Sequence, residues 1–270
     1  MKDFWIRGKN IVIVGATTLV GRYLTYKLIE IYNCKVFAIS ENQSGLDIIT
    51  DNVGEYGTNL EAHCFKTSLE KNWENFANYL TDNSKSVDIL INTTVNIPKF
   101  NKFDMIDQRE IIQTMNTNFY SSVFSTRHLL PLLKNSRHAG IINISYLLDE
   151  YGNIGSSAYV SSASALQSYT EVLSEELKNV YVCLVKVGRA KTDIYANQSK
   201  EIIERVSKRV MSVDKLTDRI IKGISKKHKH IVVGTYAHIN ELFAKFLPDI
   251  KNKLEERRRT QKEIKLIDSE

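Results

Sequence analysis

The sequence contains few residues that break or cross-link a chain. Only three of its 270 residues are proline and three are cysteine. Cys34, Cys64 and Cys183 each lie in an apolar, strand-like run, and none has the short spacing of a metal-binding or redox pair. We therefore interpret them as reduced thiols of the core and expect no metal site.

Long apolar segments are also lacking. No run approaches the roughly 20 apolar residues of a membrane-spanning helix. Residues 1–5 lack the apolar core of a signal peptide. A cytoplasmic location is therefore expected.

The sequence shows no internal repeat and no low-complexity linker. With 43% hydrophobic residues, the chain is long enough to bury one large core. We expect one domain over residues 1–235, with residues 236–270 as a basic helical extension of the same domain.

The positive charge is concentrated near the C-terminus. The formal net charge is +6, and residues 222–270 hold twelve lysines and arginines against seven acidic residues. An electrostatic partner is therefore expected to meet the C-terminal end. A nucleic acid is not expected, because the basic run has no interleaved aromatic side chains.

Short β-branched runs alternate with stretches of helical spacing, which is typical of a parallel sheet covered by helices. The longest predicted helices are 108–134 and 156–178, the second capped by Ser156 or Ser157. This pattern predicts a Rossmann-type, doubly wound α/β fold with a mainly seven-stranded parallel sheet. The predicted strands are 11–15, 35–40, 61–66, 87–92, 140–145, 181–187 and 230–233.

The first predicted strand leads into a turn that begins at Gly15 and ends at Gly21, followed by a helix at 22–32. In this order of elements, backbone N–H groups and a helix N-terminus bind a pyrophosphate. Gly15 permits the tight turn and Gly21 permits close packing of helix on strand. Thr17, Thr18 and Leu19 complete the candidate nucleotide loop. The alternative is a tight turn that binds no ligand.

Ser40, at the end of the second predicted strand, is the candidate contact for the adenosine ribose. An acidic residue here favours NAD, whereas a nearby basic residue favours NADP. Glu41 follows and points weakly to NAD, but it is equally interpreted as an exposed loop glutamate. The choice between the two nucleotides stays open.

Several segments in this order resemble the short-chain dehydrogenase/reductase family. Residues 88–94 are similar to the segment that ends the family's fourth strand. Asn118 resembles the asparagine of its fourth helix, with Pro131 thirteen residues later. The remaining matches are the fifth strand at 140–145, the tyrosine helix at 156–177 with Tyr159, and the segment 187–193.

The resemblance implies an NAD(P)-dependent oxidoreductase that acts on a carbonyl or a secondary alcohol. Tyr159 is then the acid or base, Asn118 anchors a water that relays protons, and Ser145 or Tyr146 polarises the substrate oxygen. Besides the loop residues, Asn92 and Thr192 are expected at the cofactor. The expected partners are a small-molecule substrate and further copies of the chain in a homo-oligomer.

The sequence departs from the family pattern at the residues that carry its chemistry. Ala163 stands where a lysine four residues after the tyrosine lowers its pKa, and Tyr146 stands at the serine position. Lys186 and Lys191 are alternative sources of the missing cation, but they are equally interpreted as solvated loop lysines. A second hypothesis therefore stays open: a degenerate member that binds a nucleotide, ligand or protein partner without hydride transfer.

Beyond the last predicted strand, apolar residues recur at helical spacing with lysines on the other faces. This pattern predicts an amphipathic helix in residues 236–270. Such a helix rests on anionic lipid as a peripheral membrane contact, or packs over the domain or a second subunit. We favour packing.

The missing glycine generates a prediction about affinity. Thr18 and Leu19 stand at the two positions where the family's branches place the glycine that lets phosphates approach the backbone. NAD(H) and NADP(H) should therefore bind with a Kd of roughly hundreds of micromolar or weaker, about −5 kcal/mol at best. Calorimetry or nicotinamide fluorescence measures this Kd. Low-micromolar binding would contradict the prediction and strengthen the enzyme hypothesis.

Overall fold

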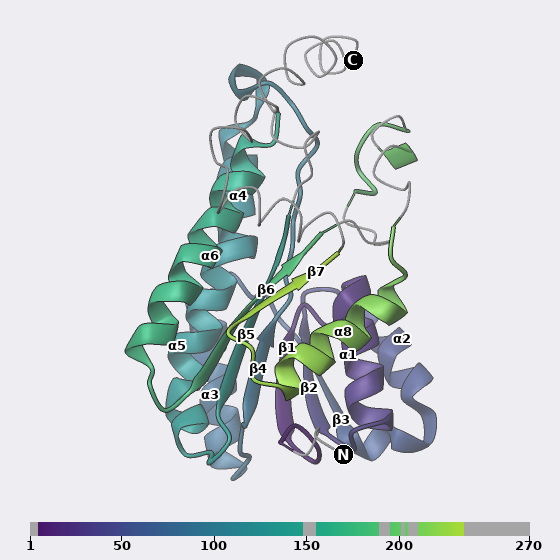
Figure 1. Cartoon of the computed structure of the whole chain (residues 1–270), viewed down its shortest axis with the longest axis vertical. Helices are drawn as coiled ribbons and strands as arrows, with labels where there is room; N and C mark the ends of the chain where they lie inside the picture. Colours follow the sequence, from purple (N-terminus) through teal and green to yellow (C-terminus); the bar gives the residue numbers. More distant parts are fainter. Residues whose placement is uncertain (1–4, 148–154, 189–194, 201–202, 205–209, 235–270) are drawn as a thin grey trace.

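The fold is built on one parallel sheet. The computed structural model describes residues 5–147, 155–188, 195–200, 203–204 and 210–234. Within them, seven strands follow the order β3-β2-β1-β4-β5-β6-β7, and every neighbouring pair is parallel (Figure 1). The strands are β1 (Asn10–Val14), β2 (Lys35–Ser40), β3 (Leu60–Cys64), β4 (Ile89–Asn92), β5 (Gly140–Tyr146), β6 (Tyr181–Val187) and β7 (His230–Val233).

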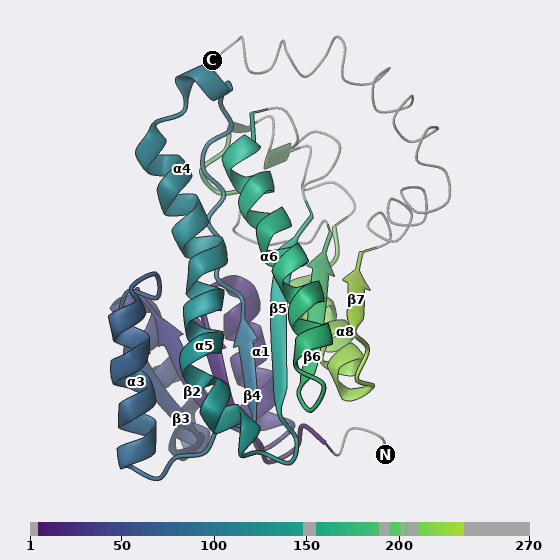
Figure 2. The same cartoon turned by 90° about the vertical axis from the view of Figure 1, so that its left-hand side faces the viewer.

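Helices cover both faces of this sheet. α1, α2 and α8 lie on one face, and α3, α4, α5 and α6 lie on the other (Figure 1, Figure 2). This arrangement confirms the predicted doubly wound α/β fold. The bounds are α1 (Leu19–Glu30), α2 (Gln43–Val53), α3 (Glu70–Asp82), α4 (Gln108–Met115), α5 (Ser121–Lys134), α6 (Ser157–Glu176) and α8 (Val213–Ser225).

The apolar run of β1 is explained by burial on both of its faces. Ile11 and Ile13 belong to the cluster under α1, α2 and α8, whereas Val12 and Val14 belong to the cluster under α3 and α5. Successive side chains of a strand point to opposite faces, so a central strand of this fold needs apolar residues at every position. The β-branched runs of the sequence therefore mark the strands correctly.

The predicted helix 108–134 differs from the structure in one respect. α4 and α5 are joined by a π-helical turn, Asn116–Tyr120, so the stretch is one rod with an irregular middle. Such turns are frequent at functional sites. Asn118, one of the predicted site residues, lies inside this turn and is buried.

Two further expectations concern the helix ends. α6 begins with Ser156 as its N-cap residue, but the serine side chain makes no capping hydrogen bond. The predicted C-terminal helix at 236–270 lies outside the described residues. Among those that are described, no helix is long and apolar enough to cross a membrane.

The strand order places a crevice at the C-terminal ends of the central strands. β1 pairs with β2 on one side and with β4 on the other, so the connections leave β1 and β4 toward opposite halves of the sheet. Ligands of open α/β sheets bind at this reversal point. Gly15 follows β1 and Thr93 follows β4, so both lie at the crevice.

A polar cluster protects the edge strand β3. Glu61 accepts hydrogen bonds from Lys85 Nζ and from the Tyr79 hydroxyl, and His63 Nε2 lies 2.8 Å from its carboxylate. Partial burial alone would raise the pKa of Glu61, but these three partners lower it to about 2. A charged edge also discourages pairing with a further strand.

This cluster predicts a pH dependence of stability. Because the folded pKa of Glu61, about 2, lies below its ordinary value of 4.5, its stabilisation is complete above pH 4.5 and is lost as the pH falls toward 2. Glu61→Gln should cost about 1 to 3 kcal/mol of unfolding free energy near neutral pH and much less at low pH. Urea denaturation at several pH values measures the difference.

Glu55→Gln is the matched control, because Glu55 is an exposed glutamate of the turn before β3. An equal loss in both variants, or a loss for Glu61→Gln that does not shrink at low pH, would contradict the assigned role.

Candidate functional site

The turn after β1 packs directly against the end of β4. Gly15 has a φ of +79°, and a Cβ on it would lie 2.9 Å from the Thr94 backbone nitrogen. A Cβ on Gly21 would lie 2.3 Å from the Gly15 carbonyl oxygen. Both glycines are therefore required by close backbone approach, as the sequence predicts.

Thr18 closes this turn as the N-cap of α1. Its hydroxyl accepts a hydrogen bond from the Gly21 amide at 3.0 Å and donates one to the Gly15 carbonyl at 2.8 Å. The Thr18 and Thr93 hydroxyl oxygens are 3.1 Å apart across the crevice. Leu19 and Val20 occupy the first positions of α1, where amides have no acceptor within the helix. These two amides are the available phosphate donors of the loop.

The adenosine side of the loop is tied to β2 and α2. The Thr17 and Ser40 hydroxyl oxygens lie 2.6 Å apart, so two predicted site residues are in direct contact. Arg22 donates from Nη2 to the Thr17 carbonyl at 3.3 Å. A Cβ on Gly45 would lie 2.7 Å from Thr17 Cγ2. Sequence reasoning missed Arg22 and Gly45, because their contacts join separate elements.

Glu41 makes a contact that its sequence position does not reveal. One of its carboxylate oxygens accepts hydrogen bonds from the Thr67 amide at 2.8 Å and from the Thr67 hydroxyl at 3.0 Å. The carboxylate thus holds the turn after β3. Glu41 is an exposed residue of the loop after β2, as the second interpretation expects, and its contact with Thr67 is an addition that the sequence does not show.

Asn92 lies in a buried polar chain that crosses the sheet. Ser125 donates to its Oδ1, and its Nδ2 donates to Asn143 Oδ1, each at 2.8 Å. Asn143 in turn donates to the Thr170 hydroxyl of α6 at 2.8 Å. The Asn92 side chain therefore links β4 to α5 and β5, and its contact with a cofactor stays a prediction. Thr192 lies outside the described residues.

Asn118 clamps the segment that follows β4. Its Oδ1 accepts from the Asn96 amide at 2.6 Å, and its Nδ2 donates to the Asn96 carbonyl at 2.9 Å. The same Nδ2 donates to Ser162 Oγ at 2.9 Å, and this serine donates to the Tyr159 carbonyl at 2.7 Å. The structure therefore brings Asn118 and the tyrosine helix together.

Tyr159 is buried and its hydroxyl is engaged. The hydroxyl donates to the Tyr146 carbonyl at 2.7 Å, and only 2% of the residue is exposed. Burial raises the pKa of Tyr159 well above its ordinary value, and the nearby Tyr195 and Tyr146 raise it further. In this arrangement the phenol donates to a backbone carbonyl inside the protein, and its role as acid or base stays a prediction.

The two candidates for the polarising group face opposite sides of β5. Ser145 Oγ accepts from Gln167 Nε2 of α6 at 3.2 Å. Tyr146 belongs to the buried cluster that also contains Tyr159 and Ala163. Strand alternation explains the separation. Tyr146 contacts the Tyr159 hydroxyl through its backbone carbonyl, and Ser145 contacts Gln167 on the helix that carries Tyr159.

The position that carries the lysine in the family pattern holds Ala163, which supplies no cation. Ala163 is buried in the same cluster as Tyr159. Val185 and Val187 of β6 also belong to this cluster, so Lys186 between them faces the side of the sheet that α6 covers, and it pairs in register with Ser145. Lys191, the other alternative, lies outside the described residues.

The residues present fit the phosphates of a dinucleotide in backbone shape and in donor groups. The cradle is the Gly15 turn, which a Cβ would close against Thr94. Leu19 and Val20 supply helix N-terminal amides. Leu19, which packs against the hydrophobic core, is the departure, because the main branch of the family has glycine at this position, whereas Thr18 supplies a cap.

Three kinds of comparison agree with this geometry. The family model described as short chain dehydrogenase matches residues 9–203. A 3-ketodihydrosphingosine reductase of Dictyostelium discoideum is 28% identical over 74% of this chain and 64% of its own length. A 3-oxoacyl-(acyl-carrier-protein) reductase of Aquifex aeolicus is 25% identical over 76% of this chain and 83% of its own.

Solved structures share the fold at low sequence identity. A short chain dehydrogenase of Burkholderia cenocepacia, solved with NADP, superposes with a TM-score of 0.76 at 18% identity, covering 94% of this chain and 99% of its own. A short-chain dehydrogenase of Streptomyces avermitilis gives 0.75 at 20% identity, covering 93% and 97%.

The loop geometry predicts the effect of restoring a glycine. Leu19→Gly removes the side chain at the cradle, and we expect at least about tenfold tighter NADP(H) binding, equivalent to about 1.4 kcal/mol. The same change should lower the unfolding free energy by about 1 kcal/mol or more, because glycine weakens a helix. Fluorescence titration and urea denaturation measure the two effects.

Leu19→Ala is the control for loss of apolar packing alone, since it keeps a Cβ at this position. Equal nucleotide affinity in the glycine variant and the unmodified protein would show that Leu19 does not limit phosphate approach.

Proposed function

The chain belongs to the short chain dehydrogenase family, and on that basis we propose that it is an NAD(P)-dependent oxidoreductase that reduces a carbonyl group. The observation that carries the proposal is the cradle formed by the Gly15 turn, the Thr94 backbone and the first turn of α1. The first amides of α1 lie at the reversal point of the sheet, where ligands of open α/β sheets bind, and they are donors that a phosphate can use.

The names of the relatives indicate a substrate class. Both the 3-ketodihydrosphingosine reductase and the 3-oxoacyl-(acyl-carrier-protein) reductase are named for a keto group at carbon 3. We therefore propose a 3-keto compound as the substrate. The alignment spans 64% of the Dictyostelium relative, so we do not assign the complete activity of that enzyme to this chain.

The bound nicotinamide would supply the hydride, and the protein's own residues handle the proton. Tyr159 is the donor to the substrate oxygen, after its hydroxyl leaves the Tyr146 carbonyl that it contacts at 2.7 Å. Its raised pKa keeps the phenol protonated. A protonated phenol gives up a proton to a carbonyl oxygen but does not remove one from an alcohol. Reduction is the direction that the names of the relatives indicate.

Asn118 and Ser162 position this donor. Asn118 holds the Asn96 backbone and the Ser162 hydroxyl, and Ser162 bonds to the Tyr159 carbonyl. The start of α6 is thereby fixed relative to the segment after β4. The Tyr146 hydroxyl, in the same cluster as Tyr159, is the proposed group that polarises the substrate oxygen.

A second candidate is a family member that binds the nucleotide without hydride transfer. The observation that favours it is the environment of Tyr159, where Ala163 supplies no cation and the phenol donates to a backbone carbonyl. A tyrosine that no cation activates transfers protons poorly, and loss of a proton-transfer partner typically lowers the rate by a factor of about 10² to 10⁴.

The two candidates predict different responses to one substitution. If the site is a slow reductase, Ala163→Lys brings a cation to Tyr159, lowers its pKa and should raise turnover by at least about tenfold, which is about 1.4 kcal/mol. Tyr146→Ser should add to this gain. Loss of NADPH absorbance with 3-ketodihydrosphingosine as the substrate measures turnover in the two single variants and the double variant.

Tyr159→Phe is the matched control, since it removes the hydroxyl and keeps the ring in the core. It should abolish any turnover of the unmodified protein and of the Ala163→Lys variant. Folded variants that bind NADPH and transfer no hydride would refute the reductase proposal and favour the binding protein.

A further inference from the structure

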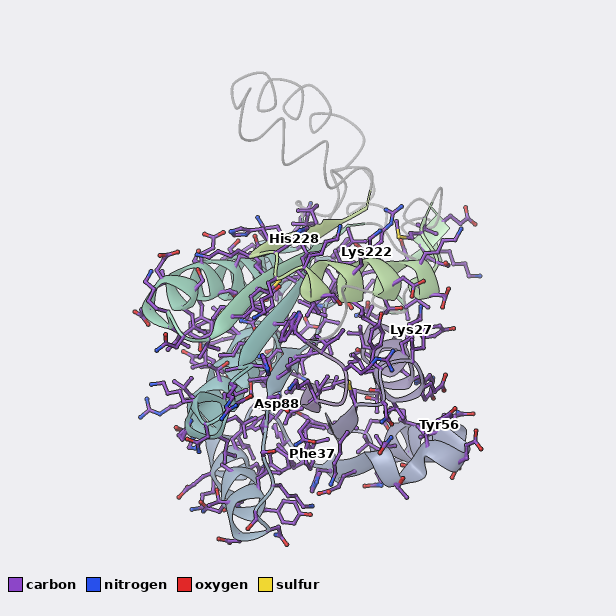
Figure 3. All side chains as sticks on the ribbon, turned by 60° about the horizontal axis from the view of Figure 1, so that its bottom comes forward. Lys27, Phe37, Tyr56, Asp88, Lys222 and His228 are labelled. Atoms are coloured by element: carbon purple, nitrogen blue, oxygen red, sulfur yellow. The ribbon has the colours of Figure 1, made fainter. Side chains whose placement is uncertain are left out.

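A second concave site lies at the end of the sheet opposite the nucleotide loop. It is a depression of about 330 Å³ formed by three connections, α5–β5, α6–β6 and α8–β7. All three precede strands, so the depression lies at the edge where strands begin. Figure 3 brings this end of the molecule forward, with His228 of the α8–β7 connection labelled. The volume is at the lower end of the range of ligand sites.

Four permanent cations line this depression, and they come from all three connections: Arg137, Lys178, Lys227 and Lys229. Glu175 is the carboxylate paired with this group, since Lys178 Nζ lies 2.7 Å and Lys229 Nζ 3.1 Å from its two oxygens. These two lysines lower the pKa of Glu175 to about 2, so it stays ionised. One carboxylate thus faces four cations.

The other two cations have no carboxylate partner among the described residues. Arg137 makes no ion pair there, and Lys227 Nζ lies 4.9 Å from the centre of the Trp5 ring. Asp88, which contacts the neighbouring Ser136, is already held by that serine hydroxyl and by the Asn10 amide. Cations gathered without compensation repel one another, and an anion between them removes this cost.

The floor of the depression is rigid. Tyr181 lines it, and its ring packs edge-on against Trp5 with centroids 5.5 Å apart. Its hydroxyl donates to the His228 carbonyl at 2.7 Å, which ties β6 to the α8–β7 connection. Trp5 Nε1 donates to the Ile224 carbonyl at 3.0 Å. The walls are therefore held in place without a ligand, which lowers the entropic cost of binding one.

From this combination we propose that the depression binds a phosphate-bearing anion, held by Arg137 and Lys227, with Lys178 and Lys229 at its rim. Arginine and lysine are the side chains that form charge-assisted hydrogen bonds to phosphate oxygens. The site is separate from the nucleotide loop, because it lies at the opposite ends of the strands. Part of the charge that the sequence assigns to the C-terminal end, at Lys227 and Lys229, thus belongs to the body of the domain.

The test uses the full chain and two sources of phosphate. Calorimetry with inorganic pyrophosphate probes a free anion, and flotation with phosphatidylcholine vesicles containing phosphatidic acid probes a lipid headgroup. We expect the double variant Arg137→Ala and Lys227→Ala to raise the Kd at least tenfold for whichever of the two ligands the unmodified protein binds. This change corresponds to about 1.4 kcal/mol of binding free energy.

Lys71→Ala is the control, because it removes one exposed cation from α3. If the double variant loses pyrophosphate binding and the control keeps it, the depression is a site for a soluble phosphate. If the double variant loses vesicle binding and the control keeps it, the depression binds a lipid headgroup. Absence of binding in both arms, or equal weakening in the double variant and the control, would overturn the proposal. Circular dichroism confirms that each variant is folded.

Discussion

The arrangement of the candidate site depends on one buried amide, that of Asn118. It bonds to both backbone groups of Asn96 and to Ser162 of α6. These three contacts fix the exit of β4 against the start of the tyrosine helix. Loss of this amide would leave the partly buried N–H and C=O of Asn96 without these hydrogen bonds, which destabilises the segment. The position of Tyr159 is therefore set from outside its own helix, by an amide on the π-helical turn.

The fold could be predicted from the sequence because its signals are local. β-branched runs such as Ile11–Val14 are needed on a strand that is buried on both faces, so the pattern and the burial carry the same information. Gly15 and Gly21 are likewise forced by backbone contacts within one turn. The irregular turn at Asn118 was missed, because nothing in the apolar spacing of 108–134 distinguishes a π-helical turn from an α-helical one.

The candidate site was only partly predictable, since its contacts join residues far apart in the chain. Asn92 has the right position for a cofactor contact, yet it bonds to Ser125 and Asn143. Tyr159 has the right position for an acid, yet its hydroxyl is satisfied by the Tyr146 carbonyl. In both cases a neighbour across the sheet or from another helix competes for the polar group. The sequence identifies the polar side chain, but it does not show which distant residue forms a hydrogen bond with it.

The π-helical turn also sets how the two halves of its rod are related. A turn of this kind holds one more residue than an α-helical turn. One residue corresponds to roughly 100° of rotation about the helix axis. The faces of α4 and α5 are therefore out of phase, and a single helical wheel drawn through 108–134 assigns inward and outward positions wrongly on one side of Asn118. Because the turn takes up the extra residue locally, deleting one residue between 116 and 120 would leave a regular helix in which both halves keep the faces that they now present.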